Sequence, residues 1–287
     1  MAREARYRII EKYRGEYEIN MMCRLLEVSR AAYYAWRKKS REPDRDQPRM
    51  KLVEEAYLVS RRTYGYRRIH LWLKQNKGIC INHKAVLRLM NKMGIYSIAR
   101  RRYPYHSNRG QPNHHRYPHI LKQQFQANRP NQKWCSDITY VRLLSGWGYL
   151  CVIKDLFDGF VVAHHFSKRC DVALVTTTLK KALQKEMVTA GTLLHSDQGL
   201  QYASHEYFVL TKAYKLLPSM SRKGNCWDNA PVESFFSYFK EEALRQQPRL
   251  SFEEVKRLID DYVYFYNHER IQLRTKQTPF QLRSLFV

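Results

Sequence analysis

The apolar residues in the front part of the chain recur at the spacing of short helices. Between residues 19 and 26 they lie three and four positions apart, which is typical of one helical face. Ser29 suits the N-cap of a second helix, which carries aromatic residues at 33, 34 and 36 and ends in the basic run 37–39. A helix, a tight turn and a basic helix form the arrangement of a helix-turn-helix.

A second pair of helices is predicted between residues 64 and 94. An apolar stripe runs through Ile69, Trp72 and Leu73, and the next helix begins after Asn82 and ends at Gly94. Four basic residues are expected on the outer faces of this pair and are candidate DNA contacts: Arg67, Arg68, Lys84 and Arg88. For each of them alone, an ordinary solvated helix face is the alternative interpretation.

Residues 99–130 have no apolar period. They contain four prolines and the run Arg100–Arg102, so they are predicted to form a basic linker that can follow a phosphate backbone. Three of the histidines are metal ligands by residue type, namely His114, His115 and His119. Their context is rich in Pro, Asn and Arg, which favours a solvated loop over a metal site.

The pattern changes at Trp134, where strands replace helices. Strands are expected over residues 134–143, 149–153 and 160–166, and Asp158-Gly159 predicts a two-residue hairpin before the third strand. Asp171 can cap a following helix, after which residues 192–195 form another strand. That strand is reached by a crossover, so we expect it to be parallel to its neighbour. This order is the opening of a ribonuclease-H-like sheet.

The positive charge of the chain is concentrated in its front half. The net charge is +25; residues 1–133 hold 31 Lys and Arg against 10 Asp and Glu, an excess of 21, and residues 134–287 hold 20 against 16, an excess of 4. Such an asymmetry predicts a polyanionic partner, of which nucleic acid is the commonest. A basic protein without such a partner is the alternative.

Composition also narrows the class of protein. The chain has no run of about 18 apolar residues and no apolar segment after its charged N-terminus, so we expect neither a membrane span nor a secretory signal. Its six cysteines form no CxxC pair, which favours reduced thiols in a cytoplasmic protein, with a structural zinc site as the alternative.

Three acidic residues stand where carboxylates are unusual. Asp137 lies inside the first predicted strand, although carboxylates are poor strand formers and costly to bury. Asp197 ends the fourth predicted strand, the position at which open α/β sheets place their sites. Glu233 lies in the first turn of a helix that Pro231 begins. Each residue alone is more simply explained as a cap or a surface group.

The helix from Pro231 to about residue 245 separates its apolar and polar sides. At 100° per residue, the phenylalanines at 235, 236 and 239 fall on one face, which we expect to be buried. Glu233 and Lys240 fall on a common edge, about 10 Å apart along the axis. The carboxylate could therefore reach a metal ion while Lys240 reaches a phosphate.

Phosphodiester chemistry explains why three carboxylates would gather. Two Mg²⁺ ions roughly 3.5–4 Å apart can activate the attacking hydroxyl and stabilise the leaving oxygen. Mg²⁺ prefers oxygen ligands and keeps several waters, so a few carboxylates suffice. Two Mg²⁺ ions, with Mn²⁺ as a substitute, are therefore the expected cofactors.

Three motifs resemble the integrase core of bacterial insertion-sequence transposases, with the best match to the second-reading-frame product of insertion sequence family three. They are Trp-x-x-Asp-Ile-Thr-Tyr (134–140), His-Ser-Asp-Gln-Gly-x-Gln-Tyr (195–202) and Asp-Asn-Ala-x-x-Glu-Ser-Phe-Phe-x-x-x-Lys (228–240). Thirty-five residues separate Asp197 from Glu233, as in the D,D(35)E pattern of that superfamily, and Lys240 matches its lysine. Tyr266-Asn267-x-x-Arg270 and Thr278-Pro279 also resemble this family.

The resemblance implies a fold and a division of the chain. The fold class is α/β, a ribonuclease-H-like mixed five-stranded sheet flanked by helices and preceded by an all-α helix-turn-helix-like region. Residues 1–98 would bind DNA, 99–130 would form the linker, and 131–287 would be the catalytic core with C-terminal helices. Before the catalytic helix, Arg222 and Lys223 become candidate DNA contacts, while Asn225 and Asp228 would order their loop, with Asp228 as a metal ligand the less favoured reading.

The implied activity is DNA transposition. Asp137, Asp197 and Glu233 would hold the metal ions that cleave and join strands at terminal inverted repeats and target DNA. The expected partners are double-stranded DNA, further copies of the chain on that DNA, and an upstream-frame helix-turn-helix and leucine-zipper protein, as a partner or a fusion. The expected location is the bacterial cytoplasm, with the nucleoid. Two alternatives stay open: a non-catalytic DNA-binding accessory or regulatory subunit, and a ribonuclease-H-like hydrolase that cannot join strands.

Overall fold

The computed structural model describes residues 3–41, 44, 46–98, 117–222 and 225–286. The chain divides into two compact units, Met1–Glu55 and Ala56–Val287. The boundary lies within the region that the sequence predicts as a single helical part, residues 1–98. Each unit is described by itself.

The first unit is a small helical bundle with an aromatic core. Its helices are α1 (Arg3–Tyr13), α2 (Ile19–Leu25) and α3 (Arg30–Arg41). Tyr33 is fully buried, and its hydroxyl donates a hydrogen bond to Glu11 on α1. The Ser29 hydroxyl accepts the Ala32 N–H at 3.0 Å and so caps α3. The predicted pair of helices at 19–39 is confirmed, whereas α1 was not anticipated.

Three further helices follow along the chain: α4 (Gln47–Val59), α5 (Tyr66–Lys77) and α6 (His83–Met93). The predicted start of α6 after Asn82 and its predicted end at Gly94 are confirmed, whereas the end of α5 at Gly78 was not predicted. The Asn82 side chain accepts the Lys84 N–H, and Gly78 and Gly94 stop the helices in the left-handed conformation. α4 was missed. The prediction that Arg68 lies on the outer face of its helix is wrong. Its side chain is partly buried and its Nε is enclosed.

The second unit is built on a mixed sheet of order β3-β2-β1-β4-β5. Its strands are β1 (Lys133–Arg142), β2 (Trp147–Asp155), β3 (Val161–Ser167), β4 (Leu193–Ser196) and β5 (Leu217–Met220). β1, β2 and β3 are antiparallel neighbours, and β4 runs parallel to both β1 and β5. The predicted five-stranded mixed sheet, including the parallel fourth strand, is confirmed.

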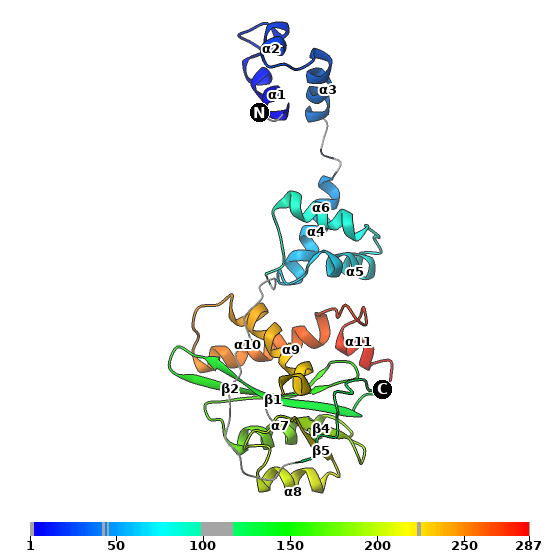
Figure 1. The fold of residues 1–287 in the computed structure, drawn as a ribbon, viewed down its shortest axis with the longest axis vertical. Helices are drawn as coiled ribbons and strands as arrows, with labels where there is room; N and C mark the ends of the chain where they lie inside the picture. The colour runs from blue at the N-terminus through cyan, green and yellow to red at the C-terminus, as the bar shows by residue number, and fades with distance from the viewer. Residues whose placement is uncertain (1–2, 42–43, 45, 99–116, 223–224, 287) are drawn as a thin grey trace. The chain divides into compact units, whose positions relative to one another are not determined.

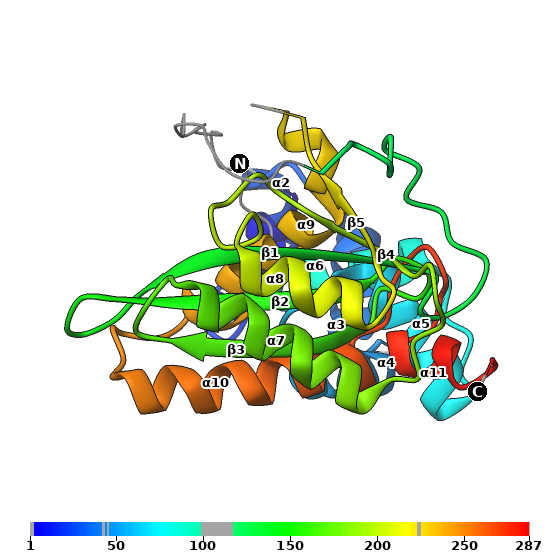
Figure 2. The ribbon, with the colours of Figure 1, turned by 90° about the horizontal axis from the view of Figure 1, so that it is seen from below.

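Helices cover both faces of this sheet. On one face lie α7 (Val172–Lys185) and α8 (His205–Ala213), packed over a core that includes Trp134 (Figure 2). The other face carries α9 (Ala230–Phe239) and α10 (Phe252–Tyr264), with the short α11 (Pro279–Arg283) at the end of the chain (Figure 1). Residues alternate between the two cores along β1, as the two-residue period of a strand requires.

The connection between β2 and β3 is longer than predicted. β2 ends at Asp155 and β3 begins at Val161, so the two-residue hairpin expected at Asp158-Gly159 is wrong. The buried carboxylates of Asp155 and Asp158 hold the wider loop by accepting backbone N–H groups and by pairing with Arg283. Hydrogen bonds from such distant segments are invisible to a local turn rule.

The described end of the predicted linker is packed rather than solvated. Leu121 is buried in the core beneath α9, and the Ile120 N–H donates to Ser219 of β5. His119 contacts the Met220 carbonyl at 3.1 Å, so the solvated-loop prediction is wrong for this residue. His114, His115 and the Arg100–Arg102 run lie outside the described residues.

Candidate active site

Asp137 lies in the middle of β1, on the face covered by α9. Its register partner on β2 is Val152, which belongs to the core under that helix. The side chain is partly exposed, and its Oδ1 accepts the N–H of Ile138 at 2.8 Å. A carboxylate is therefore set into an otherwise apolar surface at the centre of the sheet.

Asp197 directly follows β4, the parallel neighbour of β1. The two strands pair Cys135 with His195, and the same register continued by two residues brings Asp197 beside Asp137. The Asp197 Oδ1 accepts the N–H of Gly199 at 3.0 Å, so a tight turn holds this carboxylate.

His195 fixes the end of β4 through hydrogen bonds. Its side chain is fully buried, and its two ring nitrogens lie 2.9 Å from the Ser219 hydroxyl and 3.1 Å from the Ser221 hydroxyl. Burial lowers the pKa of His195 to about 4, so its ring is neutral at physiological pH. The histidine of this motif therefore joins β4 to the end of β5.

Glu233 lies in the first turn of α9, the helix that covers the face of the sheet on which Asp137 lies. Val232 and the phenylalanines of this helix are buried, whereas Glu233 and Lys240 are exposed. The predicted polarity of the helix is confirmed. Its continuation to residue 245 as a regular α-helix is wrong, because residues Lys240–Leu244 form a π-helical turn. That wider turn allows Glu242 and Ala243 to be buried together.

The three carboxylates influence one another's ionisation. Burial raises the pKa of Asp137 well above its ordinary value, and the negative charges of Asp197 and Glu233 raise it further. Burial also raises the pKa of Asp197, and burial followed by the charge of Asp197 raises the pKa of Glu233. Three acids from distant segments of the chain are thus coupled electrostatically.

Lys240 is the cation of this cluster. The protein atoms around its ammonium group lower the pKa of that group by desolvation, although the residue as a whole is exposed, and the charge of Asp137 opposes that shift. In return, Lys240 lowers the pKa of Asp137, but this effect is weaker than the desolvation and the repulsion that raise it. The negative charge of the cluster is therefore only partly compensated by the protein.

This donor set fits a hard divalent cation. All three side chains supply oxygen, and their mutual repulsion is relieved when a cation binds between them. Among the residues that the structure describes, however, no three His, Cys, Asp or Glu side chains stand close enough to hold one ion together. Mg²⁺ is commonly held by one or two carboxylates with waters and phosphate oxygens, which pairs of these residues can provide.

The loop before α9 is ordered by a buried carboxylate. Asp228 is fully buried, accepts the Arg222 N–H at 2.9 Å, and pairs with the Arg222 guanidinium. These bonds hold the pKa of Asp228 well below its usual range. Asn225 caps the following turn by accepting the Trp227 N–H. Both residues act as the loop-ordering groups that the sequence suggested.

Asn229 is a residue that sequence reasoning passed over. It is buried, its Nδ2 donates to the carbonyl of Ser136, and its Oδ1 has no hydrogen-bond partner among the described residues. Ser136 precedes Asp137, so this amide ties the start of α9 to the strand that carries the acid. Its place in the Asp-Asn-Ala run was the available signal.

The predicted DNA contacts have different surroundings. Arg67, Lys84 and Arg88 lie on exposed helix faces, and Lys240 lies beside the acids. Arg222 is half-exposed but engaged with Asp228, and Arg68 is turned inward. Lys223 lies outside the described residues.

Comparison with known proteins decides the family. Integrase core domain models match residues 127–226 and 233–285, and an HTH-like domain model matches residues 43–103. The transposase InsF for insertion sequence IS3A of Escherichia coli (strain K12) is 35% identical over 265 residues, which are 90% of each chain. InsK of insertion sequence element IS150 from the same organism is 34% identical over 278 residues, covering 96% of this chain and 97% of that protein.

The chain belongs to the insertion-sequence transposases of the IS3 family. Its function is DNA transposition by an enzyme of the DDE transposase and integrase type. Membership implies dependence on a divalent metal and binding to DNA. Among solved structures, the catalytic core domain of HTLV-2 integrase in complex with magnesium is 18% identical, covering 54% of this chain and 97% of that one, with a TM-score of 0.45. No helix in the described part of this transposase is long and apolar enough to cross a bilayer.

Proposed function

We propose that this transposase cleaves and joins DNA strands at the terminal inverted repeats of its element with Asp137, Asp197 and Glu233. The observation that carries the proposal is the shared electrostatic field of these acids, which come from β1, the end of β4 and α9. Two Mg²⁺ ions bound there, with Mn²⁺ able to replace them, would supply the activated hydroxyl and neutralise the leaving oxygen.

The protein's own part is to position the carboxylates. The Ile138 and Gly199 N–H groups each fix one oxygen of an aspartate, so the remaining oxygens are free to bind a cation. Glu233 is exposed in the first turn of α9, and the charge of Asp197 acts on it. Lys240 stands seven residues further along, where its ammonium can bind a DNA phosphate next to the reacting bond.

DNA binding by the front part of the chain completes this proposal. Residues 1–98 would bind the element end, the basic segment 99–130 would follow the backbone, and residues 131–287 would perform the chemistry. Arg67, Lys84 and Arg88 are exposed and suited to phosphate contacts. Several copies on DNA, and the upstream-frame protein as partner or fusion, would bring two ends together.

The test is cleavage of a duplex that carries the flanking inverted repeat, with Mg²⁺ or Mn²⁺, followed by mapping of new 3′ ends and of strands joined to a target duplex. Asp137→Asn, Asp197→Asn and Glu233→Gln should each lower the rate at least about a hundredfold, since each removes a group that acts at the reacting phosphate. Glu253→Gln is the matched control, because Glu253 is also an exposed first-turn glutamate, on α10.

Wild-type rates in all three variants would show that these acids are not the catalytic residues. A chain that binds this DNA but never cuts it with either metal would instead support an accessory subunit. Cleavage without any joined product would support a simple hydrolase.

A further inference from the structure

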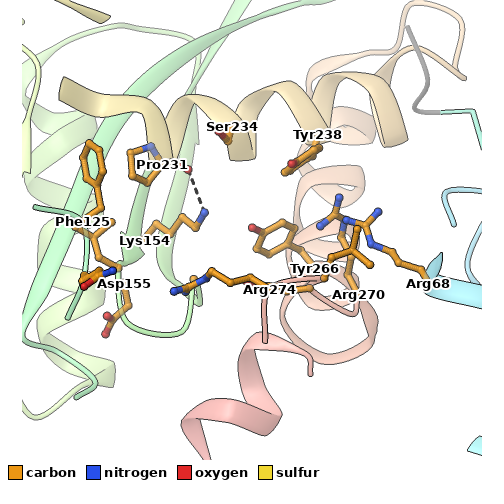
Figure 3. A pocket seen from close by; sticks show the side chains of 15 residues that line it. Arg68, Phe125, Lys154, Asp155, Pro231, Ser234, Tyr238, Tyr266, Arg270 and Arg274 are labelled. Carbon is orange, nitrogen blue, oxygen red and sulfur yellow. Dashed lines mark hydrogen bonds between the residues drawn. The ribbon is translucent and has the colours of Figure 1, made fainter. Parts of the chain in front are cut away.

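A basic cavity lies beside α9 in the second unit. Its volume is about 620 Å³, within the range of roughly 300–1,000 Å³ that is usual for ligand pockets. Its walls come from α5, the end of β2, one side of α9, and the segment 266–274 (Figure 3).

The cavity is separate from the three acids. It is lined by Pro231, Ser234 and Tyr238 of α9, whereas the candidate catalytic edge carries Glu233 and Lys240. At 100° per residue the two sets lie about 140° apart around the helix, one on each side of its buried phenylalanine face. α9 therefore stands between two different surfaces.

Three cations of the cavity are not paired with an acid. Lys154 is buried and donates to the Pro231 carbonyl at 3.0 Å, and Arg274 donates to the Phe157 carbonyl at 3.3 Å. The Nε of Arg68 is enclosed without a hydrogen-bond partner. Within the described ranges, none of these three side chains forms an ion pair with a carboxylate.

The nearby carboxylates are already occupied. Glu242 accepts two hydrogen bonds from Arg270, at 2.9 and 2.7 Å, and a third from Tyr262. Asp155, which also lines the cavity, shares Arg283 with Asp158 and Glu186. An anion that enters the cavity would therefore bind on the side of Lys154 and Arg274, which form no ion pair with a carboxylate among the described residues.

Aromatic rings complete the walls. Tyr266 lies under the Lys154 ammonium at 5.7 Å, and Tyr238 lies over the Arg270 guanidinium at 4.3 Å while remaining 38% exposed. Figure 3 shows these rings together with Arg68 and Arg274 around the same space. Proteins bind single-stranded nucleic acid with two kinds of side chain: cations that contact the phosphates and exposed aromatic rings that stack on the bases.

We propose that this cavity binds one nucleotide, with its phosphate against Lys154 and Arg274 and its base against Tyr238. The proposed function suggests that the nucleotide belongs to a DNA strand that leaves the duplex. The assignment to a DNA strand rests on the proposed function, whereas the binding of a nucleotide as such does not. A free nucleoside triphosphate has the same chemistry. In either case the cavity is a second site for nucleic-acid chemistry, distinct from the metal-binding edge.

Binding is measured on the full chain carrying Glu233→Gln, in EDTA, so that neither cleavage nor its failure affects the result. The probes are a six-nucleotide single-stranded DNA, dATP and inorganic pyrophosphate. The DNA carries 5-iododeoxyuridine for photo-crosslinking, and crosslinked peptides are mapped by mass spectrometry. Arg274→Gln is the first variant, because this exposed side chain makes a single hydrogen bond, to a carbonyl, with the residues that the structure describes.

Lys276→Gln is the matched control, since it is an exposed lysine two residues away that does not line the cavity. Arg274→Gln should weaken probe binding about fivefold or more, as expected for a lost charge-assisted contact to phosphate, and Lys276→Gln should leave it within about twofold. Crosslinks should map to peptides containing Tyr238 or Tyr266.

Tighter binding of DNA than of dATP would support a strand in the cavity, and the reverse order would support a free nucleotide. Equal effects of the two variants, with crosslinks only outside the cavity, would overturn the proposal. Lys154→Met gives a second check if its melting temperature matches that of the parent, and unchanged affinity in that variant would also count against the site.

Discussion

Neutralising one of the proposed catalytic acids should make the metal-free transposase more stable while removing its activity. Asp197→Asn keeps the shape of the side chain and the amide oxygen that can accept the Gly199 N–H, but it removes a partly buried negative charge beside Asp137. Desolvation and repulsion both disfavour that charge in the wild-type fold. The variant should therefore unfold at a higher temperature than the wild type in EDTA.

The size of the effect follows from linkage. Each unit by which the folded pKa exceeds the unfolded value costs the ionised fold about 1.4 kcal/mol at pH above both values. Each kcal/mol of that cost removed by the substitution corresponds to a rise in melting temperature of roughly 2–4 °C for a folded unit of this size. Because the folded pKa is raised, the unfolded chain loses its proton first, and wild-type stability falls as pH rises from about 4 towards the folded value.

The assay is thermal unfolding of wild type, Asp197→Asn and the control Glu253→Gln, between pH 4 and 8, in EDTA and with Mg²⁺. Metal should raise the melting temperature of the wild type by offsetting the repulsion and should raise that of Asp197→Asn much less. If Asp197→Asn were destabilised in EDTA at pH 7.5 without any loss of packing, and Mg²⁺ stabilised both proteins equally, the reasoning from a shared charged site would be wrong.

Three other predictions concern different parts of the chain. Glu242→Gln should lower the free energy of unfolding of the second unit by about 3–5 kcal/mol, measured with urea, because it leaves the buried Arg270 without a carboxylate. The double variant Glu242→Leu and Arg270→Met should recover most of that free energy. Equal losses in the two variants would contradict the pairing argument. Replacing Arg67 and Lys84 together by Gln should reduce the slope of log affinity against log salt by about 2, measured by fluorescence anisotropy on duplex DNA, and an unchanged slope would exclude them as phosphate contacts. His195 is neutral in the fold and has a pKa of about 4, so its contribution to stability is present above about pH 6.5 and is lost as pH falls towards 4; His195→Gln should flatten that limb of the stability profile, and an unaltered limb would assign it to other groups.

Local patterns predicted the elements that carry the candidate site. The caps at Ser29 and Asn82 and the alternation along β1 act within a few residues, so they can be read from neighbouring positions. The parallel position of β4 followed from the crossover that precedes it. The position of Asp137 inside a strand, the position of Asp197 at a strand end and the phenylalanine face of α9 then singled out the three acids as candidates.

Long-range contacts account for what the patterns missed. The β2–β3 connection is wide because Arg283, more than a hundred residues later, pairs with Asp155 and Asp158. Arg68 turns inward beside the buried Arg270 instead of following the polar face of its helix. His119 packs on β5 although its neighbours in the sequence are those of a loop.

The sequence alone therefore determined the order of the first four strands and the family, and it singled out the three acids as candidates, since each depends on residue type and spacing along the chain. Only the tertiary structure decided which charges are compensated and which are not. Desolvation depends on what packs above a side chain, and a buried cation such as Lys154 is left without an acid by segments that no local pattern connects.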